Sequence, residues 1–263
     1  MGTESHQVEI LNKHGRGGVI ILCDHATNRV PEALYRDGKP LGLAARDMGR
    51  HIAWDIGAAA ITRRLSALMD VPAVLAPVSR LVIDCNREPD HPTLVPDRSD
   101  GVMIPANQGL DGAAIAARKA AWYDPFHDAA ADLVASHLRE GRVPLVVGMH
   151  SFTPVMNDKV RPWHIGFLWN RDRRLAQAMI GLIERETDLR VGDNEPYSGR
   201  ALYHSMQAHG ADHGLPQTTV EVRNDLVNTP DRVEQWARLL ADILDECMNR
   251  PDVCYRAEEG QMT

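Results

Sequence analysis

The chain has 263 residues, 44% of them hydrophobic and 25% charged, so its composition is that of a globular protein and not of a disordered one. A net charge of −7 leaves no basic surplus for phosphates, and we expect no nucleic-acid partner. The longest apolar runs, such as residues 143–149, are far shorter than the roughly 20 residues of a membrane helix. The first residues lack the pattern of a signal peptide, and the four scattered cysteines contain no CxxC pair. We therefore expect a cytoplasmic protein with reduced thiols and no membrane partner.

Short apolar runs alternate along the chain with longer segments whose apolar residues have helical spacing. The runs predict buried strands at residues 18–23, 73–78, 81–85, 144–149, 164–169 and 218–222. The longer segments predict helices at residues 47–69, 111–139 (broken near Pro125), 173–186 and 231–248, the last opened by Thr229 and Pro230. The proline-rich segment 88–109 predicts a long loop, and residues 249–263 predict a polar, frayed tail.

Apolar strands separated by helices are typical of a mostly parallel sheet that helices cover on both faces. The chain has no internal repeat and no linker rich in glycine and serine. We therefore expect an α/β fold in which residues 1–263 form a single hydrolase domain, with the polar tail at about residues 249–263. In such sheets, ligands bind beyond the carboxyl ends of the strands.

Polar side chains capable of catalysis occur at the ends of four predicted strands. These segments are Asp24-His25, residues 84–87 (DCNR), His150-Ser151 and residues 221–225 (EVRND). Because the carboxyl ends of parallel strands meet at one edge of a sheet, the sequence predicts an active site there.

Two histidines at strand ends, His25 and His150, are candidate metal ligands, although each could instead bond to a loop or cap a helix. Catalytic zinc takes about three protein ligands from His, Asp and Glu. His51 and Asp55 lie four residues apart on a predicted helix, so either could supply the third ligand or orient another one. They could also be a surface pair. Asp24 offers a further carboxylate beside His25, and the chain has no HExxH motif.

Four further residues suit substrate binding or proton transfer. Arg87, assisted by Asn86, could hold a carboxylate through a bidentate pair, and Arg223 is a second candidate. The alternative is that Asp84 pairs with Arg80 or Arg87 and only braces the loop. Glu221 has apolar or β-branched neighbours, so burial would raise its pKa and suit it to act as a general base. The alternative is an ion pair with Arg223, two residues along the same strand.

Other catalytic patterns have little support. Ser151 follows His150 and Ser79 precedes Arg80, but no GxSxG elbow accompanies either serine. Neither GxGxxG nor GxxxxGK[ST] is present, so dinucleotide and P-loop chemistry have no support.

Several motifs together resemble the N-formylglutamate amidohydrolase family, in the same order and over residues 19–240. The motifs are residues 23–31 (CDHATNRVP), 51–58 (HIAWDIGA), 79–87 (SRLVIDCNR), 150–154 (HSFTP), 161–163 (RPW), 192–197 (GDNEPY) and 221–226 (EVRNDL). The resemblance implies a fold like that of zinc-dependent exopeptidases of the carboxypeptidase type. That fold is a three-layer α/β/α sandwich around a mixed, mostly parallel sheet.

The resemblance also implies roles for individual residues. His25 and His150 match the histidine ligands of zinc or another divalent cation. Asn86 and Arg87 resemble the pair that holds a terminal carboxylate, and Glu221 resembles the general base. Carboxypeptidases place a ligand glutamate three residues after the first histidine, where this chain has Asn28. We therefore expect Asp55 to be the third ligand, with His51 or Asp24 as alternatives.

The expected function is a metal-dependent amidohydrolase that cleaves N-formylglutamate or a similar N-acyl amino acid, with Glu221 as base for a metal-activated water. Such an enzyme would act in histidine degradation. Arg87, Arg161 or Arg223 would hold the carboxylates of this small-molecule substrate. Two alternatives are a metal-dependent hydrolase of another acyl amino acid or small peptide, and a metal-free binding protein on the same fold. The sequence leaves the native metal and the oligomeric state open.

Overall fold

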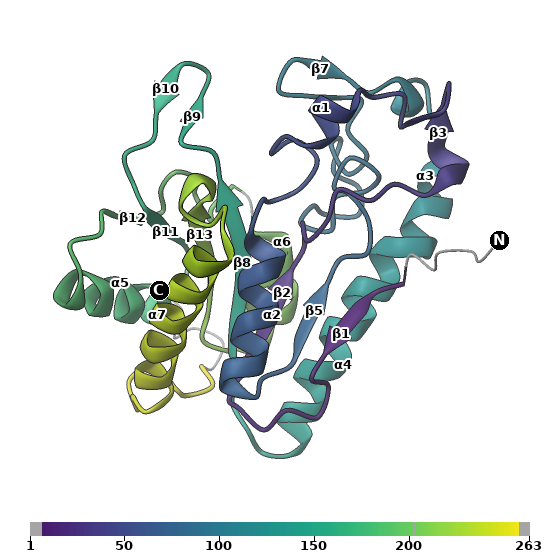
Figure 1. Cartoon of the computed structure of the whole chain (residues 1–263). Helices are drawn as coiled ribbons and strands as arrows, with labels where there is room; N and C mark the ends of the chain where they lie inside the picture. Colours follow the sequence, from purple (N-terminus) through teal and green to yellow (C-terminus); the bar gives the residue numbers. More distant parts are fainter. Residues whose placement is uncertain (1–6, 202, 258–263) are drawn as a thin grey trace.

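A mixed seven-stranded sheet forms the centre of the molecule (Figure 1). The structure, a computed structural model, describes residues 7–201 and 203–257. In spatial order the strands are β1 (Glu9–Leu11), β5 (Ala73–Leu75), β2 (Val19–Cys23), β8 (Leu145–Phe152), β13 (Gln217–Arg223), β11 (Ile165–Leu168) and β12 (Val191–Asp193). The four strands from β5 to β13 are parallel, β1 is antiparallel to β5, and β11 is antiparallel to β13 but parallel to β12. The predicted mixed, mostly parallel sheet is confirmed.

Helices cover both faces of this sheet. On one face, α2 (Ala58–Met69), α5 (Arg174–Glu186) and α7 (Pro230–Met248) form a buried core with strand residues such as Ile21 and Val147. On the other face, α4 (Asp124–Arg139) and α6 (His204–His209) pack with Ile20 and Val146. Successive strand residues point to opposite faces, so β2 and β8 contribute to both cores. The fold is the expected three-layer α/β/α sandwich.

The remaining elements are short and lie in the connections. They comprise the helices α1 (Ala45–Met48) and α3 (Gly112–Arg118), the π-helical turn η3 (Lys119–Tyr123), the 3-10 turns η1 (Glu32–Leu34), η2 (Pro105–Asn107), η4 (Ala211–His213) and η5 (Asn224–Leu226), and three hairpins, β3 (Tyr35–Arg36) with β4 (Lys39–Pro40), β6 (Arg98–Ser99) with β7 (Val102–Met103), and β9 (Val155–Met156) with β10 (Lys159–Val160). The hairpins β6–β7 and β9–β10 lie at the same end of the sheet (Figure 1).

The helix predicted at residues 47–69 is wrong in its first half. Helix α1 ends at Met48, and α2 begins only after Gly57, which has a positive φ of 87°. A Cβ atom at Gly57 would clash with the side chain of Val227. Between the helices, the N–H of Asp55 donates to the carbonyl of His25 at 3.0 Å. His51 and Asp55 therefore lie in an irregular segment and do not share a helix face.

The strand predicted at residues 81–85 does not form either. The carbonyl of Leu81 accepts a hydrogen bond from the side chain of Asn107 at 2.8 Å, and that of Val82 accepts one from Arg118 at 2.9 Å. Buried carbonyls need partners, and here side chains take the place of a neighbouring strand. The strand predicted at 73–78 is correspondingly shorter, since β5 ends at Leu75.

Two other predictions need correction. The segment 111–139 does not break near Pro125, because α3, the π-helical turn and α4 follow one another directly and Pro125 occupies the first turn of α4. The predicted frayed tail is ordered over residues 249–257, where Val253 is buried and the N–H of Ala257 donates to Gly214 at 2.8 Å. Residues 258–263 of the tail lie outside the described residues.

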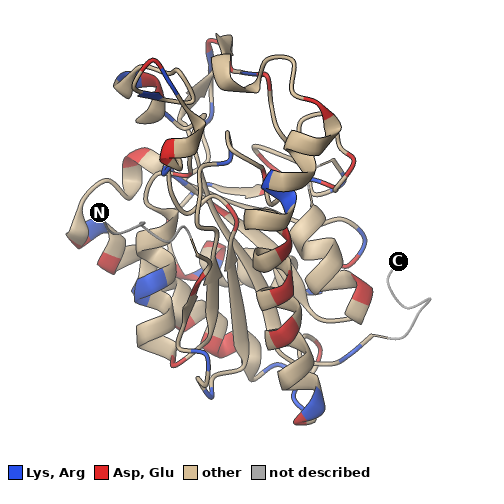
Figure 2. Ribbon diagram, turned by 90° about the vertical axis from the view of Figure 1, so that its right-hand side faces the viewer, with Lys and Arg blue, Asp and Glu red and all other residues tan. Residues whose placement is uncertain are grey.

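Charged residues lie mainly on the helices and loops around the sheet (Figure 2). Within the described ranges, none of the helices combines the length and apolar character needed to cross a bilayer.

Candidate active site

The central strands β8 and β13 bring His150 and Glu221 side by side. The two strands are parallel, and Glu221 lies opposite His150 in their register. The preceding residues, Met149 and Val220, belong to the core on the α2–α5–α7 face. Because side chains alternate along a strand, His150 and Glu221 both project from the opposite face. His25 joins them from the loop after β2, next to β8.

These side chains line a cavity of about 370 Å³ at the carboxyl ends of β2, β8 and β13. A cavity of this size fits a small molecule. Residues of several loops complete it, including Arg98 and Asp100 of the β6–β7 hairpin and Met156 of β9. The position is the one predicted from the polar residues at the strand ends.

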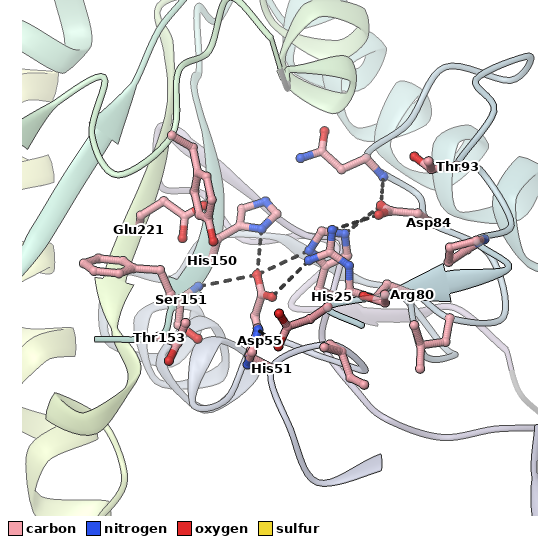
Figure 3. A pocket seen from close by; sticks show the side chains of 18 of the residues that line it. His25, His51, Asp55, Arg80, Asp84, Thr93, His150, Ser151, Thr153 and Glu221 are labelled. Carbon is pink, nitrogen blue, oxygen red and sulfur yellow. Dashed lines mark hydrogen bonds and ion pairs between the residues drawn. The ribbon is translucent and has the colours of Figure 1, made fainter. Parts of the chain in front are cut away.

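Within this cavity, His25, Asp55 and His150 point toward one another (Figure 3). One ligand atom from each of the three buried side chains lies within 4.8 Å of the others. The Oδ2 atom of Asp55 lies 3.3 Å from Nδ1 of His25 and 2.8 Å from Nδ1 of His150. His51 lines the same cavity but is not a member of this group, and its Nε2 atom lies 3.7 Å from Asp100. Asp55 is therefore the carboxylate within reach of both Nδ1 atoms.

The second ring nitrogen of each histidine is held by another carboxylate. Nε2 of His25 lies 2.7 Å from Asp84, and Nε2 of His150 lies 3.1 Å from Asp24. Histidines that ligate metals commonly bond a carboxylate in this way, which fixes the orientation of the ring. Asp24, an alternative third ligand from the sequence, thus lies on the outer side of His150.

Asp84 has a role that the sequence did not indicate. One alternative from the sequence has it brace its loop, and it does pair with Arg80, at 2.9 Å, while Arg87 lies further away at 3.9 Å. In addition, it holds the ring of His25. The signal was its place in the motif SRLVIDCNR, but the ring that it holds is 59 residues away in the sequence.

Buried carboxylates and cations are paired within the group, and Arg80 lies 3.5 Å from Asp55 and 2.9 Å from Asp84. Burial alone would raise the pKa of Asp55, but His25 and His150 hold it below its ordinary value. Burial alone would lower the pKa of His150, but hydrogen bonds to Asp24 and Asp55 raise it well above its usual range. Each histidine is thus stabilised as a cation by the carboxylates around it.

A divalent cation fits this donor set. Two imidazole nitrogens and a carboxylate oxygen are the ligand types that zinc takes in hydrolases. Four buried carboxylates, those of Asp24, Asp55, Asp84 and Glu221, surround the histidines, and a bound cation would balance part of their negative charge.

Glu221 is the remaining carboxylate at the site. Its Oε2 atom is buried without a hydrogen-bond partner in the part of the chain that the structure describes. Burial raises the pKa of Glu221 to about 7. The alternative ion pair with Arg223 does not form, because Arg223 pairs with Asp225 at 2.8 Å. Glu221 therefore has the character of a group that exchanges protons near neutral pH.

A model of the N-formylglutamate amidohydrolase family matches residues 17–228. The chain belongs to this family. Membership makes it a hydrolase that acts on an amide bond of a small-molecule substrate. No curated protein matches the chain.

Two solved structures extend this comparison. The crystal structure of gene product Atu2144 from Agrobacterium tumefaciens is 35% identical over 92% of this chain and 95% of that chain, with a TM-score of 0.88. The N-formylglutamate amidohydrolase from Ralstonia eutropha JMP134 is 16% identical over 90% of this chain and 95% of that chain, with a TM-score of 0.62. The second structure shares the fold.

Of the four residues expected to bind the substrate of this amidohydrolase, two line the cavity and two do not. Asn86 and Arg87 line it. Arg161 is not among the lining residues; it donates to the hydroxyl of Tyr197 at 2.9 Å and stacks on its ring. Arg223 is turned to Asp225 and is not among the lining residues. Arg98, which the sequence analysis did not single out, lines the cavity instead.

Proposed function

We propose that the chain is a metal-dependent amidohydrolase that cleaves the amide bond of N-formylglutamate or a similar N-acyl amino acid. The observation that carries the proposal is the convergence of His25, Asp55 and His150 beside Glu221 in a cavity of small-molecule size. The three residues would hold zinc or another divalent cation. Such a cation supplies a Lewis acid that polarises the amide carbonyl and lowers the pKa of water to about 7.

Glu221 is the proposed general base. As a carboxylate it takes a proton from the attacking water while the water oxygen forms a bond to the carbonyl carbon. It then delivers this proton to the nitrogen as the C–N bond breaks, so that the products are the free carboxylic acid and the amino acid. A pKa raised to about 7 by burial suits both steps at neutral pH.

Arg87 is the proposed partner of the substrate's α-carboxylate, with Asn86 beside it. The Nε and Nη1 atoms of Arg87 are held by Thr93 at 3.2 Å and by the carbonyl of Asn86 at 3.0 Å. The side chain is thus oriented before substrate arrives, and a planar guanidinium can hold a carboxylate through two hydrogen bonds. Arg161 and Arg223 were the other candidates, and their contacts with Tyr197 and Asp225 favour Arg87.

Two broader features are part of the same proposal. All four cysteines are free, which supports the proposed cytoplasmic location. The two cores share the strands of one sheet, which supports one domain over residues 1–263.

The proposal is tested by assaying the purified protein on a matched set of substrates. We expect formate release from N-formylglutamate and slower hydrolysis of N-acetylglutamate. A preference for another acyl amino acid or a dipeptide would reassign the substrate. No hydrolysis of any of these amides by protein containing its metal would contradict the proposal and favour a binding protein.

A further inference from the structure

The segment 84–87 carries the two residues assigned to the substrate carboxylate, yet it has no regular secondary structure. A loop of this kind holds its side chains in place only if its backbone groups find partners elsewhere. In this protein the carbonyls of Cys85 and Arg87 find their partners in side chains of the helical run of α3, the π-helical turn and α4, and α6 holds those side chains in turn.

Two side chains beneath the segment donate hydrogen bonds to its carbonyls. The hydroxyl of Tyr123 donates to the carbonyl of Arg87 at 2.8 Å, and Nε2 of His127 donates to the carbonyl of Cys85 at 3.0 Å. Tyr123 and His127 are four residues apart, so they lie on the same side of the helical run. Tyr123 ends the π-helical turn, and such turns frequently occur at functional sites.

The two donors are themselves held by histidines of α6. Because Nε2 of His127 donates to a carbonyl, its Nδ1 atom accepts a hydrogen bond, which Nε2 of His209 supplies at 2.8 Å. Nε2 of His204 donates likewise to the hydroxyl of Tyr123 at 2.6 Å. Burial lowers the pKa of His127 to about 3 and that of His209 to about 4. Both rings are therefore neutral near pH 7, as this chain of donors and acceptors requires.

Ser205, also on α6, bonds the same segment and the metal-binding half of the site. Its N–H donates to the side-chain oxygen of Asn86 at 3.2 Å, and its hydroxyl donates to Asp24 at 2.8 Å. Asp24 in turn holds the ring of His150. Ser205 thus joins Asn86, through its N–H, to the carboxylate behind a candidate metal ligand, through its hydroxyl.

We propose that His127 and Tyr123 are positioning residues, which hold the backbone of segment 84–87 so that Arg87 and Asn86 meet the substrate carboxylate. This inference rests on the role proposed above for Arg87. Neither side chain is among those that line the cavity, so each acts through the segment and not on the substrate.

The test compares His127→Leu, which removes the donor, with His127→Gln, whose amide can still reach the Cys85 carbonyl. One buried hydrogen bond corresponds to about a tenfold change in KM for N-formylglutamate. We expect that rise for His127→Leu with kcat nearly unchanged, and recovery of most of it for His127→Gln. Tyr123→Phe, a smaller change that should fold, is expected to raise KM similarly.

His137→Leu is the matched control, because His137 is the other histidine of α4, is buried, and bonds Leu133 within its own helix. We expect its KM to equal that of the wild type. Combining His127→Leu with Arg87→Lys should add little to the effect of Arg87→Lys alone, because His127 acts through Arg87.

Three results would overturn the inference while leaving the proposed function intact. They are a KM unchanged in both His127→Leu and Tyr123→Phe, an equal loss in His137→Leu, and full additivity with Arg87→Lys. If Arg87→Lys itself leaves KM unchanged, the proposed carboxylate role has failed and this inference fails with it.

Discussion

The Oδ2 atom of Asp55 lies 2.8 Å from Nδ1 of His150. Its position matters because the same oxygen also lies 3.3 Å from Nδ1 of His25. Without a cation, both imidazoles must carry protons to bond this carboxylate. Binding of a divalent cation by the three side chains would therefore release protons, as metal sites built from histidine commonly do.

The first prediction concerns metal content. His25→Ala, His150→Ala and Asp55→Ala each remove one donor of the group, so we expect each to lose its zinc in elemental analysis after dialysis. His51→Ala, which changes a histidine of the same cavity outside the group, should retain it. Full zinc content in both His25→Ala and His150→Ala would show that the metal is held elsewhere. If Asp55→Ala alone retains its zinc, the third ligand is His51 or Asp24 and not Asp55.

The second prediction concerns the chemical step. Glu221→Gln keeps the size of the side chain but cannot accept a proton at neutral pH. We expect kcat for N-formylglutamate to fall by about 10²–10⁴-fold, while KM changes little. Steady-state kinetics measure both constants. A kcat within a few-fold of the wild type would remove Glu221 from the role of general base.

The third prediction concerns the stability of the metal-free protein. The pKa of Glu221 is about 7 in the folded protein, above its ordinary value of 4.5. Between pH 4.5 and 7, Glu221 is protonated in the folded state but ionised in the unfolded state. The free energy of unfolding therefore falls as pH rises through this range, because folding must take up a proton. Glu221→Gln removes this loss. At pH 8 we expect its free energy of unfolding, from denaturant titration, to exceed that of the wild type by on the order of 3 kcal/mol. At pH 4 the difference should vanish, and a difference independent of pH would contradict this account.

The fourth prediction concerns Arg87. Lysine keeps the charge but lacks the planar fork, so Arg87→Lys should lower kcat/KM for N-formylglutamate by about tenfold or more. The loss should shrink for an analogue whose α-carboxylate is amidated, because that contact is absent from the start. Arg223→Lys, at an arginine that pairs with Asp225, should behave as the wild type on both substrates. An equal loss on acid and amide, with a lowered melting temperature, would make Arg87 a brace for its loop.

The sequence predicted the fold and the edge of the sheet that carries the site because both depend on local patterns. Strands such as β2 and β8 are apolar throughout, and the polar residues at their ends stand out. The predicted helix and strand segments that do not form are those in which tertiary contacts override the local pattern. The apolar spacing through Ile52 and Ile56 is helical, but Gly57 packs closely on Val227 and the chain turns there.

The fine structure of the site depends on contacts between distant residues, which no local pattern contains. Asp55 was chosen as the third ligand partly for a helix that does not form, and it reaches His150 across 95 positions. Asp84 likewise holds the ring of His25, and His127 bonds segment 84–87, through contacts between residues that are distant in the sequence. The pairing of Arg223 with Asp225 likewise appears only in the structure.

The central claim, amide hydrolysis that depends on a divalent cation at His25, Asp55 and His150, is tested most directly by one measurement. Formate release from N-formylglutamate is followed after treatment with a chelator and again after addition of one equivalent of zinc, for the wild type and for His150→Ala. We expect activity to disappear with the chelator, to return with zinc in the wild type, and to remain absent in His150→Ala. Full activity of the chelated protein, or recovery in His150→Ala, would contradict the claim.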